Sequence, residues 1–168
     1  MTPYILTAML IQPKLGNEEI HRRAQILSSA LMPLAQTDLL SKDSYTVALS
    51  SVKERAKVKF FAVSKDHSFI VDLRSKDGKW KVIGFAAKPH LDYGGKQVGL
   101  NSTRILADAS SLLADESWLI KGNFRIRVMA IGDEHVLYRF SVNPHEEWNS
   151  CYLKVGADGK LLERWEGY

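Results

Sequence analysis

Five histidines are the residues of this chain best suited to acid–base or metal chemistry: His21, His67, His90, His135 and His145. None has a second His, Cys or carboxylate at a recognised ligand spacing, and HExxH and CxxC patterns are absent from the sequence. A thiol nucleophile with a histidine base would need His145 and Cys151, six residues apart across a predicted loop. Cys151 alternates with Leu153 and Val155, which favours a buried, unreactive thiol. We therefore expect no catalytic residue, no metal and no cofactor.

Two loops carry polar and aromatic groups that could contact a partner. The stretch "KPHLDYGGK" places His90, Asp92 and Tyr93 on a segment with glycine hinges, and loops carry function more often than core elements do. The alternative interpretation is a linker built of turn-forming residues. The stretch "NPHEEWNSC" contains His145 and Trp148 beside two glutamates, and predicts a protruding loop that anchors a partner.

Composition limits the classes of protein that this chain can belong to. The 168 residues are 45% hydrophobic and 25% charged, typical of a globular chain that buries a real core. The formal charge of +4 is uneven, because residues 1–84 carry 13 Lys and Arg against 8 Asp and Glu, and the rest is balanced. Such an excess is too small to predict nucleic-acid binding by itself.

The single cysteine and the N-terminal segment bear on the compartment. Cys151 has no internal partner for a disulfide, which favours a reducing compartment. The apolar run from Tyr4 to Ile11 lacks a basic leader and is too short to span a bilayer, so we expect it to dock as a strand or short helix. We expect a cytoplasmic protein with no integral membrane segment, or a periplasmic one if a signal has been removed.

The elements that position these groups follow from the hydrophobic period. Asn17 and two glutamates predict the start of a helix whose apolar stripe continues until Pro33 ends or kinks it. The members of that stripe are Ile20, Ala24, Leu27, Leu31 and Leu34. From Ser44 the period becomes two, and four strands near residues 44–52, 57–64, 68–74 and 79–87 form a meander.

The second half repeats this order. A helix capped by Asn101 or Ser102 precedes strands near residues 123–131, 135–142, 150–155 and 160–165. A shift of 81 residues carries the turn at Asp77 onto the turn at Asp158. We infer an α+β fold of two tandem units, each a helix plus a four-stranded antiparallel meander with the helices packed on one face. The units are residues 1–88 and 101–168, joined by a linker over 89–100. The alternative is that both turns share common hairpin chemistry without duplication.

Strand alternation divides the side chains between two faces. The core-facing sets are Phe69, Val71, Leu73, Trp80, Val82, Phe124, Ile126, Val128, Val136, Tyr138 and Phe140. The opposite face combines cations with aromatic and aliphatic groups, as interfaces do. Its proposed partner-binding residues are Lys57, Lys59, Phe61, Lys81, Phe85, Arg125, Arg127 and Arg139. The alternative is that the N-terminal segment or the other half partly covers this face.

The doubled helix-plus-four-strand order resembles the tandem layout of the β-lactamase inhibitory proteins, and each half is similar to small cystatin-like folds. This resemblance implies a concave sheet that grips another protein. Our first hypothesis is therefore a non-enzymatic protein-binding module, such as an inhibitor or immunity-type protein whose partner is a toxin or an enzyme. The alternatives are a small-ligand carrier or enzyme with a pocket between sheet and helix, as in nuclear-transport-factor-2-like and cystatin-like folds, and, less favoured, a single-stranded nucleic-acid binder.

Overall fold

The computed structural model describes residues 3–89, 99–142 and 150–167, with side chains for all of these except residues 3–15, 110 and 111. The helical elements are α1 (Pro3–Leu31), η1 (Met32–Thr37), η2 (Leu39–Ser41), α2 (Ser102–Asp108), α3 (Ser110–Leu113) and η3 (Ser117–Lys121), where η denotes a 3-10 helix. The strands are β1 (Tyr45–Val52), β2 (Arg55–Ala62), β3 (Ser68–Lys76), β4 (Lys79–Lys88), β5 (Asn123–Ile131), β6 (His135–Ser141), β7 (Ser150–Gly156) and β8 (Leu161–Gly167).

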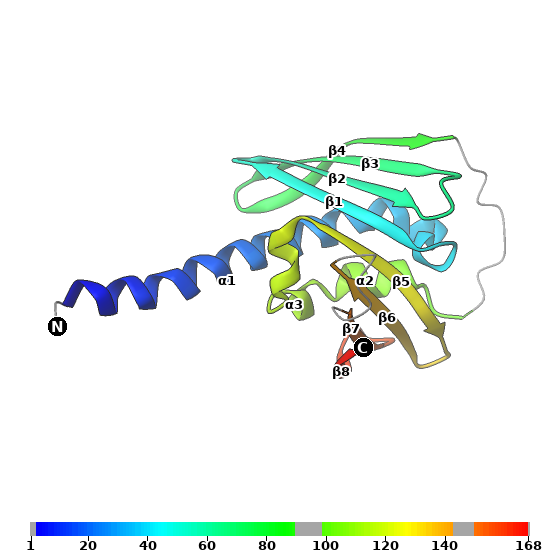
Figure 1. Cartoon of the computed structure of the whole chain (residues 1–168). Helices are drawn as coiled ribbons and strands as arrows, with labels where there is room; N and C mark the ends of the chain where they lie inside the picture. Colours follow the sequence, from blue (N-terminus) through cyan, green and yellow to red (C-terminus); the bar gives the residue numbers. More distant parts are fainter. Residues whose placement is uncertain (1–2, 90–98, 143–149, 168) are drawn as a thin grey trace.

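The described strands form one 8-stranded antiparallel sheet in the order β4-β3-β2-β1-β5-β6-β7-β8 (Figure 1). Strands β1 and β5 join its two sides, with Tyr45 opposite Ile126 and Val47 opposite Phe124. The α+β class and the antiparallel sheet are therefore confirmed. The division into two four-stranded units, with boundaries at residues 88 and 101, stays a prediction.

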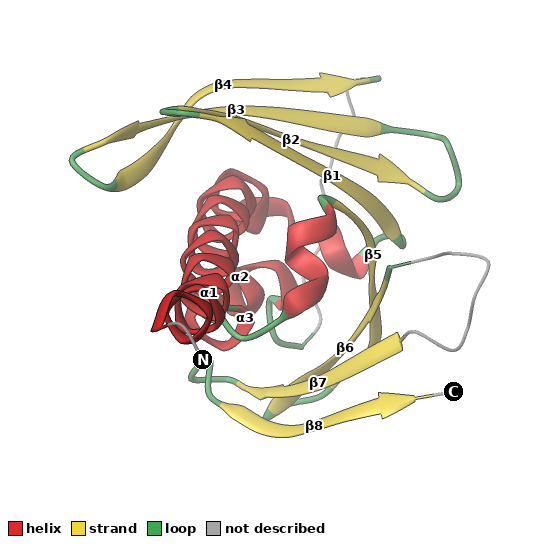
Figure 2. Cartoon of the chain, turned by 60° about the vertical axis from the view of Figure 1, so that its left-hand side comes forward, coloured by secondary structure: helices red, strands yellow, loops and turns green. Residues whose placement is uncertain are grey.

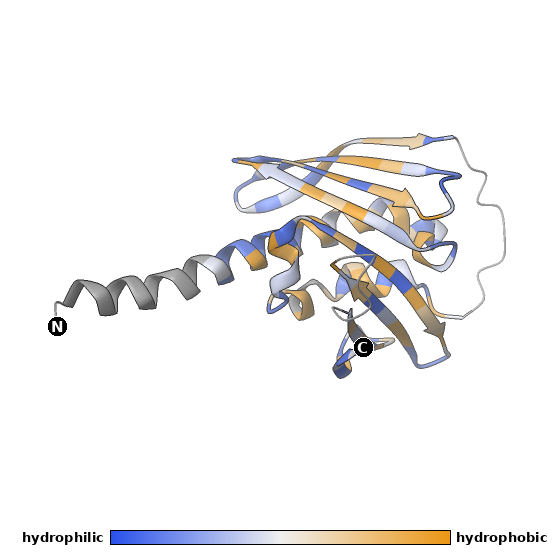
Figure 3. Cartoon of the chain, in the orientation of Figure 1, coloured by the Kyte–Doolittle hydropathy of each residue, from blue (hydrophilic) through white to orange (hydrophobic). Residues whose placement is uncertain are grey.

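The sheet curves around the helices, which lie on its concave side (Figure 2). We call this side the inner face and the opposite, convex side the outer face. Apolar side chains from the strands and helices meet under the inner face, where Val47, Phe60 and Tyr138 are fully buried. Hydrophobic and hydrophilic residues alternate along strands such as β5 (Figure 3). The open face is therefore convex, whereas the resemblance to inhibitory proteins implied a concave one.

Helix α1 begins earlier than the sequence pattern predicted. It runs without interruption from Pro3, so Asn17 lies inside it and does not cap it. An Asn-Glu-Glu sequence fits a helix interior as well as a first turn, which is why the predicted start was wrong. The predicted end is confirmed, because α1 stops at Leu31 and Pro33 lies at the start of η1. No helix among the described residues has the length and apolar character needed to cross a membrane.

The predicted apolar stripe is buried throughout, although its last member, Leu34, lies in η1, and Ile26 and Ala30 of α1 are buried as well. A helix packed on one sheet alone would bury a narrower stripe. Helix α1 contacts α2 and α3 in addition to β3 and β4, so it is enclosed on more than one side. The predicted packing of the helices on one face of the sheet therefore leaves out the contacts of α1 with other helices.

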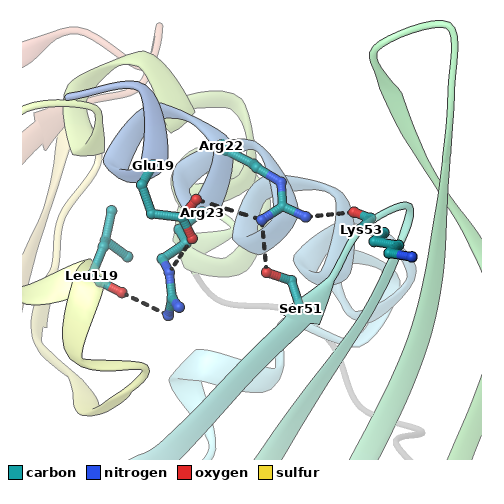
Figure 4. Close-up of polar contacts among 6 residues, drawn as sticks. All are labelled: Glu19, Arg22, Arg23, Ser51, Lys53 and Leu119. Carbon is teal, nitrogen blue, oxygen red and sulfur yellow. Dashed lines mark hydrogen bonds and ion pairs between the residues drawn. The ribbon is translucent and has the colours of Figure 1, made fainter. Parts of the chain in front are cut away.

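A polar cluster fixes α1 between distant parts of the chain (Figure 4). The Arg22 guanidinium donates to Ser51 Oγ at 3.0 Å and to the Lys53 carbonyl at 2.5 Å, at the β1–β2 hairpin. Arg23 donates to the Leu119 carbonyl at 3.2 Å, in η3. Both arginines also pair with Glu19. One helical turn therefore holds the β1–β2 hairpin and the turn before β5 in place.

A buried carboxylate joins the segment after α1 to the start of α2. Asp38, in the left-handed region at φ 45°, accepts hydrogen bonds through Oδ1 from Ser102 Oγ at 2.6 Å and from Thr103 N at 2.9 Å. Tyr138 donates to the Ser102 carbonyl, and burial, with a smaller effect of the Asp38 charge, raises the pKa of this phenol. Asn101 caps α2 by accepting from Arg104 N, as predicted. The α2 helix ends at Asp108, and the short helix α3 follows at Ser110.

A β-bulge in β4 reverses the alternation that the sequence indicated. Asp72 lies opposite Gly84 and Leu73 opposite Val82, so Ile83 is an extra residue with no partner on β3. Beyond the bulge, Phe85 pairs with Val71 and shares the inner face, so its predicted place on the outer face is wrong. Val82 has the expected face but remains 38% exposed, and Trp80 is partly buried.

The two Asp-Gly-Lys turns have different conformations. At the first, Asp77 and Gly78 both have positive φ, 53° and 74°, between the paired residues Lys76 and Lys79. This is the geometry of a two-residue type I′ hairpin. At the second turn only Gly159 has positive φ, and Gly156 N donates to the Lys160 carbonyl across a longer loop. The two turns therefore share the sequence Asp-Gly-Lys but not the backbone conformation.

Candidate protein-binding face

Strand register assigns most strand cations to the outer face. These cations are Arg55, Lys57, Lys59, Arg74, Lys76, Lys79, Lys81, Lys88, Arg125, Arg127, Arg139 and Lys154. The carboxylates at outward strand positions of the described residues are Asp72 and Glu163. The outer face is thus far more basic than the chain as a whole, whose formal charge is +4.

Lys57, Lys59 and Phe61 lie on the outward side of β2, as the sequence predicted. Lys57 Nζ is 3.6 Å from Asp72 Oδ1, and both side chains are about half exposed, so this pair adds little stability. Phe61 is exposed, and lines an open hollow of about 290 Å³ together with Lys65, Lys88 and other residues. At the other end of β2, Val52, Arg55 and Lys57 contribute to a hollow of about 310 Å³.

Arg125, Arg127 and Arg139 also lie outward, on β5 and β6. Arg127 stands directly opposite Arg139, although like charges in such cross-strand pairs destabilise a sheet. Among the described residues no carboxylate forms an ion pair with any of these arginines. Arg125 Nε is buried, and no described residue forms a hydrogen bond with it. The position of these three arginines therefore lowers the stability of the folded chain.

Two aromatic residues continue the row that the arginines begin. Arg139 is opposite Tyr152, and Tyr152 is opposite Trp165, so one register line crosses β5, β6, β7 and β8. The Tyr152 and Trp165 rings are parallel to within 2°, with centres 5.3 Å apart, and the Arg139 guanidinium lies 5.9 Å from the Tyr152 ring centre. We call Arg127, Arg139, Tyr152 and Trp165 the arginine–aromatic row.

Neither Tyr152 nor Trp165 was among the partner-binding residues proposed from the sequence. Alternation with Glu163 could have assigned Trp165 to the outer face, but only the register brings it beside Tyr152. Gly167 permits this arrangement, because a Cβ there would lie 2.4 Å from Tyr152 Cε2.

The remaining predicted site residues divide into three groups. Lys81 lies on the outer face of β4, opposite Arg74. Phe85 lies on the inner face, as described above, and is 49% exposed because β4 is the edge strand. His90, Asp92, Tyr93, His145 and Trp148 lie outside the described residues.

A separate hollow of about 240 Å³ lies between η3 and strands β7 and β8. Glu116, 3% exposed, accepts from Trp118 Nε1 at 2.9 Å and from Arg164 Nε at 2.9 Å. Hydrogen bonding to Glu116 raises the pKa of Arg164. The Cys151 thiol also lines this hollow and is buried, as predicted. Burial, and next the charge of Glu116, raises the pKa of Cys151 to about 11, so the thiol is protonated at neutral pH.

Glu116, Trp118, Arg164 and Glu166 are linked by hydrogen bonds within this hollow, and so their arrangement is that of a structural ion-pair cluster. In the described part of the chain, no three His, Cys, Asp or Glu side chains come together in a way that could hold a metal ion.

Comparisons of the chain with protein-family models, with curated proteins and with solved structures give no match. Its function must therefore be argued from its own geometry.

Proposed function

We propose that this protein is a non-enzymatic binding module that holds an acidic partner protein on its outer face. The observation that carries the proposal is the pairing of Arg127 with Arg139, directly opposite each other and without a described carboxylate beside them. An anionic group of a partner would relieve this repulsion, so the unfavourable free energy that the two arginines add to folding would favour binding.

The stacking of Tyr152 argues against a nucleic-acid base on that ring. Stacking of a base needs an open ring face. One face of Tyr152 is covered by Trp165, and Arg139 lies over its ring as well. Trp165 and Phe61 are exposed and lie on the outer face, where they offer the apolar contacts typical of protein interfaces.

Within this proposal the partner is a toxin or an enzyme, and the module acts as an inhibitor or immunity-type protein. The convex face would then enter an active-site cleft. The two-unit architecture is part of the same proposal and is supported by the strand order, in which β1 to β4 and β5 to β8 pair in sequence.

The test is selection of a displayed random peptide library on the immobilised protein. Wild type should enrich sequences that combine Asp or Glu with apolar residues, and the double variant Arg127→Glu/Arg139→Glu should weaken their binding by about tenfold or more. The matched control, Lys42→Glu/Lys160→Glu, makes the same change in net charge at exposed residues away from the row and should retain binding.

A fluorescent single-stranded oligonucleotide is the competing probe. The nucleic-acid alternative would be established if the oligonucleotide binds more tightly than any selected peptide and if Arg127→Glu/Arg139→Glu abolishes that binding. Peptide binding that survives the double variant would end the proposal.

A further inference from the structure

Strand β4 is an edge strand of the sheet. On its side away from β3, no strand among the described residues pairs with it. An edge of this kind exposes backbone N–H and C=O groups that can pair with an added strand. The strand spans Lys79–Lys88, with no proline among these residues. After the bulge at Ile83, the stretch from Gly84 to Lys88 is in regular register with β3.

The inner side of this edge is apolar and incompletely covered. Phe85 stacks on buried Phe69, with ring centres 5.9 Å apart, yet remains 49% exposed. Val82 shares this side and is also exposed. Trp80 differs, because the Arg22 guanidinium of α1 lies 5.4 Å from its ring centre and helps to cover it. Apolar side chains of an added strand would complete the cover over Val82 and Phe85.

The outer side of the same edge is basic. Lys79, Lys81 and Lys88 point outward on β4 and are exposed. Within the described residues none of them forms an ion pair. Lysines on an edge strand oppose pairing with another copy of the same strand, because the two rows of cations would face each other. They favour a strand with carboxylates at the same positions.

We propose that the free edge of β4 accepts an extended segment of the partner protein in which acidic residues alternate with apolar ones. The acidic side chains lie on the outer side beside Lys81 and Lys88, and the apolar ones lie on the inner side against Val82 and Phe85. The inference rests on the proposed protein-binding function and names the partner's chemistry.

The opposite edge of the sheet lacks this combination. On β8 the inward positions opposite Leu153 and Cys151 are taken by Arg164 and Glu166, and Arg164 is bonded to buried Glu116. An apolar row on an added strand would meet charged groups there. Charge complementarity therefore selects β4.

The test uses a synthetic peptide of alternating Glu and Val, titrated into the full chain by calorimetry. One control peptide carries Lys in place of Glu, and a second has N-methylated amides, which keep the side chains but cannot donate to β4. We expect binding of the Glu peptide only, and about tenfold weaker binding to Lys81→Glu/Lys88→Glu. Lys42→Glu/Lys160→Glu is again the matched control. Amide hydrogen exchange should slow within β4 on binding.

Equal affinity of the N-methylated peptide, absence of binding by the Glu peptide, or unchanged exchange in β4 would overturn strand addition. If affinity depends on Arg127 and Arg139 but not on Lys81 and Lys88, strand addition is wrong and the proposed function stands. If it depends on Lys81 and Lys88 alone, strand addition stands and the outer-face proposal is wrong.

Discussion

Tyr152 and Trp165 stack with parallel rings on adjacent strands of the outer face, with their centres 5.3 Å apart. Cross-strand aromatic pairs at exposed positions add up to about 1 kcal/mol of stability. We therefore expect Trp165→Ala to lower the free energy of unfolding by no more than about 1 kcal/mol, but to weaken binding of a selected acidic peptide by about tenfold. Urea unfolding and calorimetry measure the two effects. Leu162→Ala, on the same strand and also exposed, should change neither, and equal effects of the two substitutions would contradict the role of the row.

Arg164 anchors the edge strand β8 to buried Glu116 through two contacts, at 2.9 and 3.3 Å. Loss of the arginine would leave a carboxylate buried without its cation, although the partial exposure of Arg164 lets water screen part of the charge. We expect Arg164→Met to destabilise the protein by about 2 kcal/mol. The control, Arg104→Met, removes an exposed surface pair with Asp108 and should cost about 0.5 kcal/mol or less. Similar losses for both variants in urea unfolding would show that the buried pair has no special weight.

The Cys151 thiol makes stability depend on pH in the alkaline range. Its pKa rises from an ordinary value of 9.0 to about 11 in the folded chain, so the unfolded chain loses the proton first. The folded state then binds more protons between these values, and stability falls as pH rises from about 9 to about 11. Below about pH 8 the thiol is protonated in both states and has no effect.

The measurement for Cys151 is the unfolding free energy at about pH 8 and about pH 11, compared with that of Cys151→Ala. The substitution should reduce the loss of stability over this window. If wild type and Cys151→Ala lose the same amount, the thiol ionises as easily in the folded chain as in the unfolded one.

The sequence was sufficient where one local signal decides the structure. Periodicity and backbone chemistry predicted the apolar stripe, an end or kink of the helix at Pro33 and a cap at Asn101 or Ser102. In the structure the stripe is buried, α1 ends at Leu31 and Asn101 is the cap. The same holds for the outward lysines of β2, because no bulge interrupts its pairing with β1 or β3.

The sequence was insufficient where pairing between strands decides. Ile83 has no partner on β3, and this one extra residue moved Phe85 to the inner face. The arginine–aromatic row depends on register across β5 to β8, which alternation within each strand does not fix. The enclosure of α1 also depends on the curvature of the whole sheet, a property of packing and not of any single segment.

The seam between β1 and β5 offers the last prediction, at Gly122. Its carbonyl accepts from Leu49 N at 2.7 Å, its φ is 71°, and an added Cβ would lie 2.9 Å from the Leu49 carbonyl oxygen. Gly122→Ala should therefore cost both left-handed strain and a clash with backbone, together about 3 kcal/mol. Gly159→Ala is the matched control, because φ there is 80° but the nearest atoms lie 4.0 Å away. That variant should lose about 1 kcal/mol from strain alone. A clearly larger loss for Gly122→Ala in urea unfolding would show that the backbone at the seam cannot move to accommodate the added Cβ, whereas equal losses would show that it moves without cost.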